Sequence, residues 1–231
     1  MGSKRIVVLT GAGMSAESGL RTFRDANGLW EGHDVMEVAS PQGFANNPEL
    51  VFEFYNQRRR QLLEVEPNAG HNALALLEEH FQVDIITQNV DNLHEKAGSS
   101  KVLHLHGELL KVRSTKDEHH VLDWTTDLNL GDLDTNGHQL RPHIVWFGEM
   151  VPLLEPAIEI TAKADVLIII GTSMQVYPAA SLINYVSNGT PIYFIDPRPN
   201  ISSHDFLNLN VIADTAVNGV PNLVKQLIAK A

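Results

Sequence analysis

The sequence contains no cysteine among its 231 residues. A chain without thiols forms no disulfide, has no thiolate nucleophile and offers no thiolate ligand to a metal ion. The absence of cysteine says little about the redox compartment, because a cysteine-free protein is stable in either environment.

Long apolar runs are also missing. The longest late run, residues 166–170, is far shorter than the roughly 20 residues that a membrane-spanning helix needs. The run at residues 6–9 is too short for the core of a signal peptide. We therefore expect a cytoplasmic protein that does not associate with membranes.

Positive charge is scarce, since 17 lysines and arginines face 28 acidic residues and the formal net charge is −11. Such a surface repels nucleic acid and anionic membranes, so neither is expected as a partner. Hydrophobic residues make up 43% of the chain and charged residues 19%, which is typical of a folded protein with a substantial core.

Short apolar runs alternate with helical patterns along the chain. The predicted strands are residues 6–10, 83–87, 101–105, 166–170 and 191–195, with a possible edge strand at 211–212. The predicted helices are residues 49–63, 71–80, 156–162, 179–187 and 221–229. This alternation predicts an α/β fold with a parallel sheet flanked by helices.

Two stretches break the alternation. Residues from about 30 to 80 contain a loop and helices without a clear strand, and residues 111–141 are polar with turn signals. We interpret both as a smaller lobe inserted beside the sheet. The larger lobe then comprises about 1–29, 81–110 and 142–231, all within one domain spanning 1–231.

A glycine-rich turn follows the first strand. Gly11, Gly13 and Ala16 fit the pattern G-x-G-x-x-G/A, in which backbone amides approach a pyrophosphate at a helix N-terminus. Taken alone, the pattern also fits any tight strand-to-helix turn. The acidic residue expected about 20 residues later, at the end of a second strand, is missing, and this disfavours an ordinary dehydrogenase.

Polar residues follow the next two strands. Asn89 and Asp91 come after the strand at 83–87, where the carboxyl ends of parallel strands form a ligand crevice. Both can hydrogen-bond a ribose, although Asp91 could instead begin a capped helix. His104 and His106 lie on one side of the next strand, and a histidine there can act as a base near neutral pH. A histidine on a strand is more often a structural polar residue.

Five motifs in one order resemble the signatures of the sirtuin family. They are residues 11–19 with Phe23 and Arg24, residues 88–91, His106 with Gly107, residues 146–149 and residues 171–173. The resemblance extends over roughly residues 4–228. It implies a Rossmann-like large lobe and a small lobe, between which NAD and an acyl-lysine meet. The implied activity is NAD-dependent removal of acyl groups from lysine, with nicotinamide and O-acyl-ADP-ribose as products.

The resemblance also implies roles for individual residues. The implied catalytic residues are His106 as the base, with Asn89 and Asp91. Residues implied to bind NAD are Gly11, Ala12, Gly13, Ala16, Phe23, Arg24, Gln88, Asn89, Asp91, Gly171, Thr172, Ser173, Asp196 and Ala216. Residues implied to bind the substrate peptide as an added strand are Val145, Phe147, Gly148 and Glu149. The pair Asp196-Pro197 departs from the asparagine-containing pattern that is common at that place.

Tyr55 and Arg58 lie three residues apart on one face of a predicted helix. They could be an aromatic core residue beside a solvated arginine. In the sirtuin branch that removes malonyl and succinyl groups, however, a Tyr-x-x-Arg pair reads the acyl carboxylate. Arg58 would bind that carboxylate through two hydrogen bonds, with the Tyr55 hydroxyl assisting. We therefore predict desuccinylase and demalonylase activity together with some deacetylation.

Most sirtuins hold a zinc ion with four cysteines, and this chain departs from that pattern. Ser114 stands near the place of the first cysteine, and a serine cannot replace a thiolate ligand. His119, His120 and His138 match no strong ligand spacing. We expect NAD as the cofactor, no zinc or other metal, and packing around Leu122, Trp124, Leu128 and Leu133 to hold residues 114–138.

Two other functions remain open. The chain could be an NAD or ADP-ribose sensor without efficient catalysis, or a mono-ADP-ribosyltransferase that uses the same bond cleavage with another acceptor. The expected partners are acyl-lysine proteins or peptides, and the expected oligomeric state is a monomer.

Overall fold

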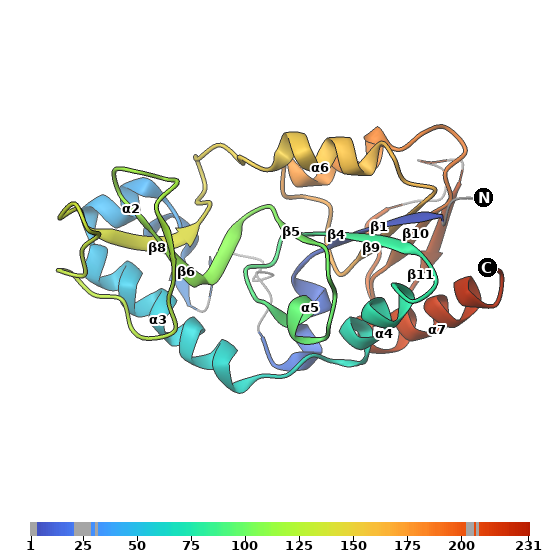
Figure 1. Ribbon diagram of the computed structural model, residues 1–231, viewed down its shortest axis with the longest axis horizontal. Helices are drawn as coiled ribbons and strands as arrows, with labels where there is room; N and C mark the ends of the chain where they lie inside the picture. Colours follow the sequence, from blue (N-terminus) through green and yellow to red (C-terminus); the bar gives the residue numbers. More distant parts are fainter. Residues whose placement is uncertain (1–3, 21–28, 31, 202–205, 207) are drawn as a thin grey trace.

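The computed structural model describes residues 4–20, 29, 30, 32–201, 206 and 208–231. Its centre is a six-stranded parallel sheet with the order β11-β10-β9-β1-β4-β5 (Figure 1). The strands are β1 (Arg5–Thr10), β4 (Gln82–Thr87), β5 (Val102–His104), β9 (Val166–Ile170), β10 (Ile192–Ile195) and β11 (Leu209–Ile212). Each strand that the sequence predicts is present, so the predicted α/β fold class is confirmed.

The strand order reverses at β1, the first strand in the chain. From β1 the chain builds β4 and β5 on one side, and it then returns to add β9, β10 and β11 on the other. Val8 of β1 is accordingly paired with Ile85 of β4 and with Ile168 of β9. In open parallel sheets, ligands bind beyond the carboxyl ends of the strands at such a reversal. Here those carboxyl ends lead into Gly11 and Gly171.

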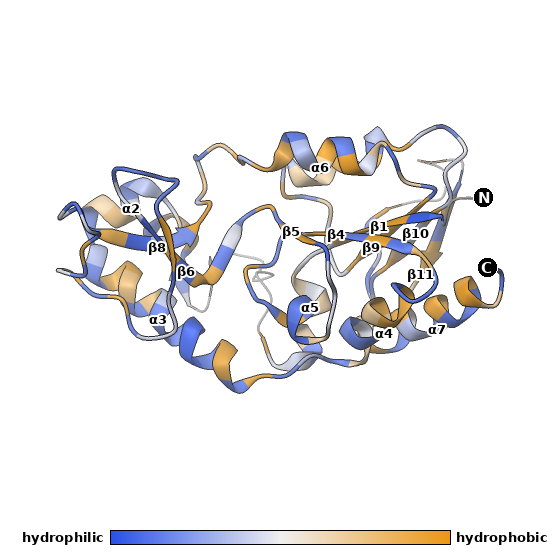
Figure 2. Ribbon diagram, in the orientation of Figure 1, coloured by the Kyte–Doolittle hydropathy of each residue, from blue (hydrophilic) through white to orange (hydrophobic). Residues whose placement is uncertain are grey.

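Both faces of the sheet are covered, and successive strand residues point to opposite faces. On one face Ile6 and Val8 pack in a core with helices α4 (Ala69–Leu77) and α7 (Ala216–Ile228). On the other, Val7 and Leu9 pack with α6 (Leu154–Thr161) and the 3₁₀ helix η3 (Ala179–Tyr185). Figure 2 shows the apolar strands enclosed between these helices.

A second sheet lies beside the first and has three antiparallel strands in the order β7-β6-β8. They are β6 (Gly107–Ser114), β7 (Val121–Asp123) and β8 (Leu140–Ile144). The long helix α3 (Pro48–Glu64) packs against β6 and β8, with the short helices α1 (Val35–Val38) and α2 (Pro41–Asn46) nearby. The two-residue strands β2 (Leu29–Trp30) and β3 (His33–Asp34) form a small hairpin, and the short helix α5 (Leu93–Lys96) follows β4.

Three predictions of local structure need correction. The stretch 30–80 contains the hairpin strand β3, which is too short to leave an apolar pattern. Helix α7 begins at Ala216 and not at Pro221, because its apolar face continues through Val220 into the core and outweighs the missing N–H of the internal proline. The helix predicted at 179–187 is a 3₁₀ helix.

Among the described residues, no helix combines the length and the apolar character that crossing a bilayer requires.

Candidate active site

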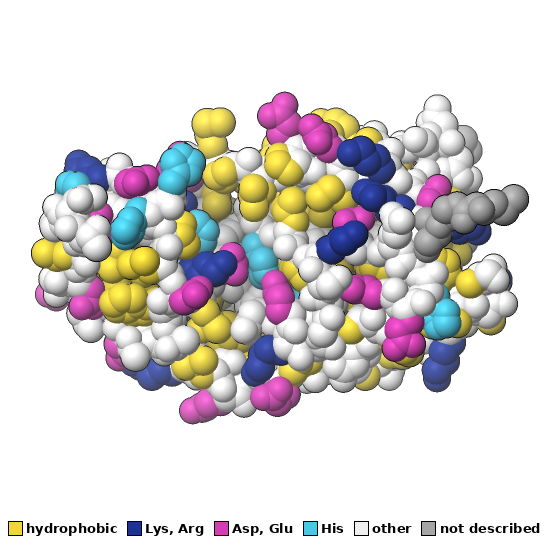
Figure 3. Space-filling model, viewed as in Figure 1, with side chains coloured by type: hydrophobic (Ala, Val, Ile, Leu, Met, Phe, Trp, Pro, Cys, Tyr) yellow, Lys and Arg dark blue, Asp and Glu magenta, His cyan; other side chains and the backbone are white. Residues whose placement is uncertain are grey.

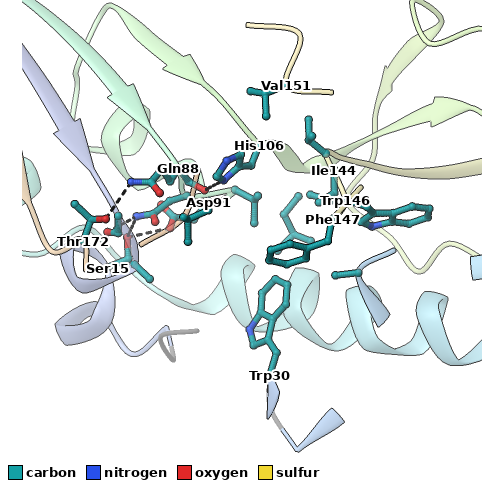
Figure 4. Close-up of a pocket in the computed structure, with 18 of the residues that line it drawn as sticks. Ser15, Trp30, Gln88, Asp91, His106, Ile144, Trp146, Phe147, Val151 and Thr172 are labelled. Atoms are coloured by element: carbon teal, nitrogen blue, oxygen red, sulfur yellow. Dashed lines mark hydrogen bonds between the residues drawn. The ribbon is translucent and has the colours of Figure 1, made fainter. Parts of the chain in front are cut away.

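A cavity of about 310 Å³ lies where the carboxyl ends of β1, β4 and β9 meet the three-stranded sheet (Figure 4). A volume of this size suits a small-molecule site. Apolar side chains are exposed in the segment just before α6, in which Met150 is 88% exposed and Leu153 is 40% exposed. Figure 3 shows apolar side chains gathered over this part of the molecule.

The glycine turn after β1 packs directly against the end of β9. The amide of Gly11 donates to the Ile170 carbonyl (3.0 Å), and the amide of Gly13 donates to the Gly171 carbonyl (2.8 Å). A Cβ atom at Gly13 would lie 2.7 Å from the Cα of Gly171, so a larger residue does not fit. The glycines therefore allow two backbone turns to meet at the edge of the cavity.

The dinucleotide pattern predicted an α-helix after this turn, but no α-helix follows it. Two 3₁₀ turns follow instead, η1 (Ala12–Met14) and η2 (Ala16–Ser18). The Gly13 amide, which the pattern would direct at a phosphate, is already bonded to the end of β9. The two turns therefore pack against each other at the place where the pattern predicted a helix N-terminus.

Ser15 connects the glycine turn to the polar segment after β4. Its hydroxyl donates to Asp91 Oδ2 (2.9 Å) and accepts from Asn89 Nδ2 (3.2 Å), while the same Asn89 amide nitrogen also donates to the Gly11 carbonyl (3.1 Å). Burial raises the pKa of Asp91, and hydrogen bonds from the Leu93 amide and from Ser15 oppose this effect. The polar side chains of this segment are therefore held by hydrogen bonds within the chain.

His71 of α4 lies behind Ser15 and is fully buried. The Asn68 amide donates to Nδ1 of His71 (3.3 Å), so Nε2 carries the ring proton and faces the Ser15 hydroxyl at 3.5 Å. Burial lowers the pKa of His71 to about 4. The ring is thus neutral at neutral pH and acts as a hydrogen-bond donor to the serine.

His106 lines the cavity and follows β5 (Figure 4). Its Nδ1 lies 3.1 Å from the Gln88 carbonyl oxygen. Because a carbonyl only accepts, Nδ1 carries the proton and the lone pair is on Nε2. Burial lowers the pKa of His106, with the Gln88 carbonyl opposing in part, so the ring is available as a neutral base.

At the ends of β1, β4 and β9, the polar groups that line the cavity are mainly amides and hydroxyls, together with the carboxylate of Asp91. Gln88 Nε2 donates to Thr172 Oγ1 (3.2 Å) and so connects the ends of β4 and β9. Asn89 and Asp91 lie on the same segment as Gln88, and Ser15 lies on the glycine turn. Such donors and acceptors fit a ligand rich in hydroxyl and amide groups, as NAD is.

Tyr55 and Arg58 of α3 both line the cavity, as their shared face predicted. Tyr55 is fully buried, and its phenol oxygen accepts a hydrogen bond from Trp146 Nε1 (3.0 Å). Burial raises the pKa of Tyr55 well above its usual range, so the hydroxyl stays protonated. The Arg58 guanidinium stacks 3.4 Å from the Phe54 ring centroid and 5.6 Å from that of Trp30.

Residues 145–149, which the sequence analysis expected to pair with a substrate peptide, follow β8 and include a turn at residues 147 and 148. The Val145 amide donates to the His106 carbonyl (2.9 Å), and the Phe147 amide donates to the Ala39 carbonyl (2.9 Å). The Trp146 amide donates to the Glu149 carboxylate (2.8 Å). Because these three amides are bonded within the chain, a peptide added here would pair with other backbone groups of the segment.

Two arginines fix this turn by binding Glu149. Arg141 approaches one carboxylate oxygen at 2.6 Å, and Arg113 approaches the other at 3.2 Å. The Arg141 guanidinium also lies 3.3 Å from the centroid of the Trp146 ring. Burial raises the pKa of Glu149 but the hydrogen bonds from Arg141 and Trp146 outweigh it, so the carboxylate stays ionised.

The structure brings most of the predicted site residues to this one cavity. Those that line it are Gly11, Ala12, Tyr55, Arg58, Gln88, Asn89, Asp91, His106, Val145, Phe147, Gly148, Glu149, Gly171, Thr172 and Ser173. Gly13, Ala16, Asp196 and Ala216 do not line it. Ala216 is the first residue of α7 and lies in the core, and the buried Asp196 accepts from the Arg198 amide (2.9 Å). Phe23 and Arg24 lie outside the described residues.

Several residues of the cavity were not predicted. Ser15 stands inside the glycine motif, and its hydroxyl beside the glycines was an available signal. Trp30 comes from the small hairpin β2–β3 and Tyr177 from the segment after β9. No local pattern marks either of these two, because only the tertiary fold brings them to the cavity.

The segment expected to hold a zinc ion in sirtuins is closed by hydrogen bonds here. Asp134 accepts from the amides of Asn136 (2.8 Å) and His138 (2.9 Å), and its interaction with the Ser114 side chain contributes most to lowering its pKa. Leu128 and Trp124 pack in a cluster with β6 and β8, whereas Leu122 and Leu133 are exposed, contrary to the prediction that they hold this segment. Within the described part of the chain, no three His, Asp or Glu side chains are grouped to hold a metal ion.

Comparison with known proteins gives consistent matches. The model of the Sir2 family matches residues 11–178. An NAD-dependent protein deacylase from Helicobacter pylori is 60% identical over 228 residues, which cover 99% of each chain. The solved structure of a Sir2 homolog–NAD complex superimposes with a TM-score of 0.87 at 40% identity, covering 99% of this chain and 90% of the other. A structure of Sir2 with a p53 peptide and NAD+ gives a TM-score of 0.79 at 29% identity, covering 97% and 93%.

Proposed function

The chain belongs to the Sir2 family, and on that basis we propose that it is an NAD-dependent protein lysine deacylase that removes succinyl and malonyl groups and also acetyl groups. One observation carries the proposal. A single cavity is lined both by the base His106 with Asn89 and Asp91, and by the pair Tyr55 and Arg58. The first group suits cleavage of NAD, and the second suits an acyl chain that ends in a carboxylate.

NAD fits the donor set at the ends of β1, β4 and β9. Gln88, Asn89 and Asp91 would hold the nicotinamide ribose and carboxamide, with Ser15 orienting Asp91. Thr172 and Ser173 would hold the adenosine half. When bound, NAD would supply the ribose that accepts the acyl group as nicotinamide leaves, and one water molecule would be consumed to release free lysine and an O-acyl-ADP-ribose.

His106 acts as the base in this proposal. Its Nδ1–H is bonded to the Gln88 carbonyl, so Nε2 is the atom that takes a proton from a ribose hydroxyl. The lowered pKa of His106 keeps Nε2 unprotonated at neutral pH. Since the Gln88 carbonyl accepts from Nδ1–H, it also fixes the plane of the ring and favours the imidazolium that forms after proton transfer.

Tyr55 and Arg58 determine the acyl preference. A carboxylate at the end of a succinyl or malonyl chain would accept from the Arg58 guanidinium and from the Tyr55 hydroxyl. The Tyr55 oxygen already accepts from Trp146, so its own proton is directed elsewhere. An uncharged acyl chain of the same length offers no carboxylate to the Arg58 guanidinium, so its binding is disfavoured.

The peptide around the acyl-lysine is proposed to bind beside the segment at residues 145–149, using other backbone groups of that segment. Support comes from the related Sir2 structure that contains a p53 peptide together with NAD+. The net charge of −11 favours peptides with basic residues.

The test uses mass spectrometry of paired acetyl-lysine and succinyl-lysine peptides of one sequence, incubated with and without NAD. NAD-dependent removal by the wild-type protein and none by His106→Ala supports the deacylase. We expect Arg58→Met to lower kcat/KM for the succinyl peptide by roughly 10- to 100-fold and to change the acetyl value little. The matched control is Arg60→Met, because Arg60 is on the same helix but is 48% exposed and lies outside the cavity.

The other outcomes separate the alternatives. Equal losses on both peptides in Arg58→Met would contradict the acyl preference but leave the deacylase in place. Binding of NAD without removal of either group would indicate a sensor. ADP-ribosylated protein without deacylated peptide would indicate a transferase.

A further inference from the structure

Two imidazoles hold the polar segment after β4 through its backbone carbonyls. Nδ1 of His106 lies 3.1 Å from the Gln88 carbonyl oxygen, and Nδ1 of His104 lies 3.2 Å from the Asn89 carbonyl oxygen. The two carbonyls are consecutive, and the two histidines are two residues apart at the end of β5. Because a carbonyl only accepts, both rings carry a proton on Nδ1.

The two rings differ at the other nitrogen. His106 is a cavity-lining side chain, whereas Nε2 of His104 lies 2.7 Å from Glu95 Oε1 of α5. A carboxylate also accepts only, so Nε2 of His104 must carry a proton as well. His104 then bears a proton on both nitrogens and is an imidazolium, while His106 is neutral.

The surroundings of His104 agree with this charge. The ring is 8% exposed, and burial disfavours the charged form, but the hydrogen bond and the charge of Glu95 outweigh burial and raise the pKa of His104. Glu108 of β6 acts in the same direction. The other titratable groups facing the ring are Asp91, whose ionised form the His104 charge favours, and the buried His94 of α5.

A neutral His104 could not hold the segment in this way. Neutral imidazole has a single N–H, so it would lose either the bond to the Asn89 carbonyl or the bond to Glu95. The side chain of Asn89 is bonded to Gly11 and Ser15, so a shift of its backbone would also move the donors beside Asp91. His104 itself does not line the cavity and acts only through this segment.

We propose that His104 is a positioning residue whose imidazolium, paired with Glu95, fixes the Gln88–Asp91 segment, so that deacylation declines at alkaline pH as this ring loses its proton. The effect on turnover rests on the proposed deacylase function. The protonation state of His104 does not, and the two can be measured separately.

The first test follows the ring nitrogens by long-range ¹H–¹⁵N NMR of the labelled protein without NAD. At pH 7 we expect both nitrogens of His104 to have imidazolium shifts and those of His106 to have the shifts of a neutral ring with Nδ1–H. The His104→Asn variant assigns the signals. A neutral His104 at pH 7 would overturn the proposal, whether or not the protein is an enzyme.

The second test measures kcat/KM against pH for the acetyl peptide. The wild-type profile should have an acid limb from His106 and an alkaline limb from His104. Glu95→Gln should move the alkaline limb down by about 1 pH unit or more and leave the acid limb in place. His104→Asn keeps one side-chain N–H for the Asn89 carbonyl and cannot titrate, so its alkaline limb should disappear while part of the activity remains.

The matched control is Glu79→Gln, the same change of charge at an exposed position of the chain, which should leave both limbs unmoved. If Glu95→Gln and Glu79→Gln gave the same profile as the wild type, the positioning role would be wrong and the deacylase would stand. If neither the wild type nor any variant deacylated the peptide, the proposed function would be wrong, and the NMR result would still decide the charge of His104.

Discussion

The indole nitrogen of Trp146 donates a hydrogen bond to the phenol oxygen of Tyr55 across 3.0 Å. The donor follows β8 and the acceptor lies on α3, 91 residues away in the chain. Because the indole uses a lone pair of the phenol oxygen, the Tyr55 proton must point in another direction. This bond connects the Tyr55–Arg58 pair to the turn that Glu149 and the two arginines fix.

Removal of this bond should weaken recognition of acidic acyl groups. Trp146→Phe keeps an aromatic ring but leaves the orientation of the Tyr55 hydroxyl unrestrained. We expect kcat/KM for the succinyl peptide to fall by roughly 3- to 10-fold, with little change for the acetyl peptide. Trp124→Phe is the control, since the Trp124 indole donates to the Asp127 carbonyl away from the cavity. A parallel fall on both peptides would show that Trp146 serves packing alone.

His71 should make the protein less stable in acid. Its pKa is lowered by burial to about 4, against an ordinary value near 6.5 in the unfolded chain. Between these two values only the unfolded state binds the proton, so the stability is complete above pH 6.5 and is lost as the pH falls toward 4. The loss at pH 5 relative to pH 7 is about 2 kcal/mol from this residue.

Urea unfolding at pH 7 and pH 5 measures this difference. His71→Gln should be less stable than the wild type at both pH values. Between pH 7 and pH 5, however, its free energy of unfolding should fall by about 2 kcal/mol less than that of the wild type. The exposed His119→Gln is the control. An unchanged fall in His71→Gln would show that the acid sensitivity comes from other groups.

Arg59 should stabilise the junction between α3 and the three-stranded sheet. The residue is 1% exposed and donates to the Leu109 carbonyl (3.2 Å), to Asn56 Oδ1 (2.7 Å) and to the Thr126 carbonyl (3.3 Å). Burial lowers its pKa to about 10, so it remains charged at neutral pH. Arg59→Met removes the donor from each of these acceptors and should lower the free energy of unfolding by about 2–4 kcal/mol.

The neighbouring Arg60 provides the comparison, because it is 48% exposed and pairs with Glu53 and Asp127 at the surface. Arg60→Met should lower the free energy of unfolding by less than about 0.5 kcal/mol in the same denaturation experiment. Similar losses in the two variants would contradict a special role for Arg59.

Removal of metal ions should not affect the protein. The hydrogen bonds of Asp134 close the segment where sirtuins hold zinc, so we expect EDTA to leave both the melting temperature and the deacylase activity unchanged. Asp134→Ala should lower the melting temperature, whereas Asp134→Asn, which keeps an acceptor oxygen, should lower it less. One zinc per chain in elemental analysis of the purified protein would contradict this prediction.

The sequence predicted the large sheet well because its strands are short continuous apolar runs. Residues 6–10 and 166–170 are buried on both faces, and in the sequence they are short runs of apolar and β-branched residues followed by glycine. The smaller sheet was not predicted, because β7 is three residues long and partly exposed and its neighbours are polar. The start of α7 was also missed, since a proline inside a helix usually marks its beginning.

The residues of the site were predicted because they stand in motifs, and the motifs stand at the carboxyl ends of strands. His106, Asn89 and Asp91 were identified in this way, whereas the Tyr55–Arg58 pair was identified from its shared face on a predicted helix. All five residues line one cavity. The backbone hydrogen bonds of residues 145–149 were not predictable, since they depend on Ala39 and His106 in separate segments.

The sequence by itself determined the fold class, the order of the strands along the chain and the chemical types of the site residues, because each of these is a property of neighbouring positions. Only the tertiary structure decided the protonation of the two histidines at and just after the end of β5. His104 and His106 are the same residue type two positions apart, and one is charged because it faces Glu95 while the other is neutral because it lies buried at the cavity. Burial and the charge of a partner set a proton equilibrium, and both come from segments that the fold brings together.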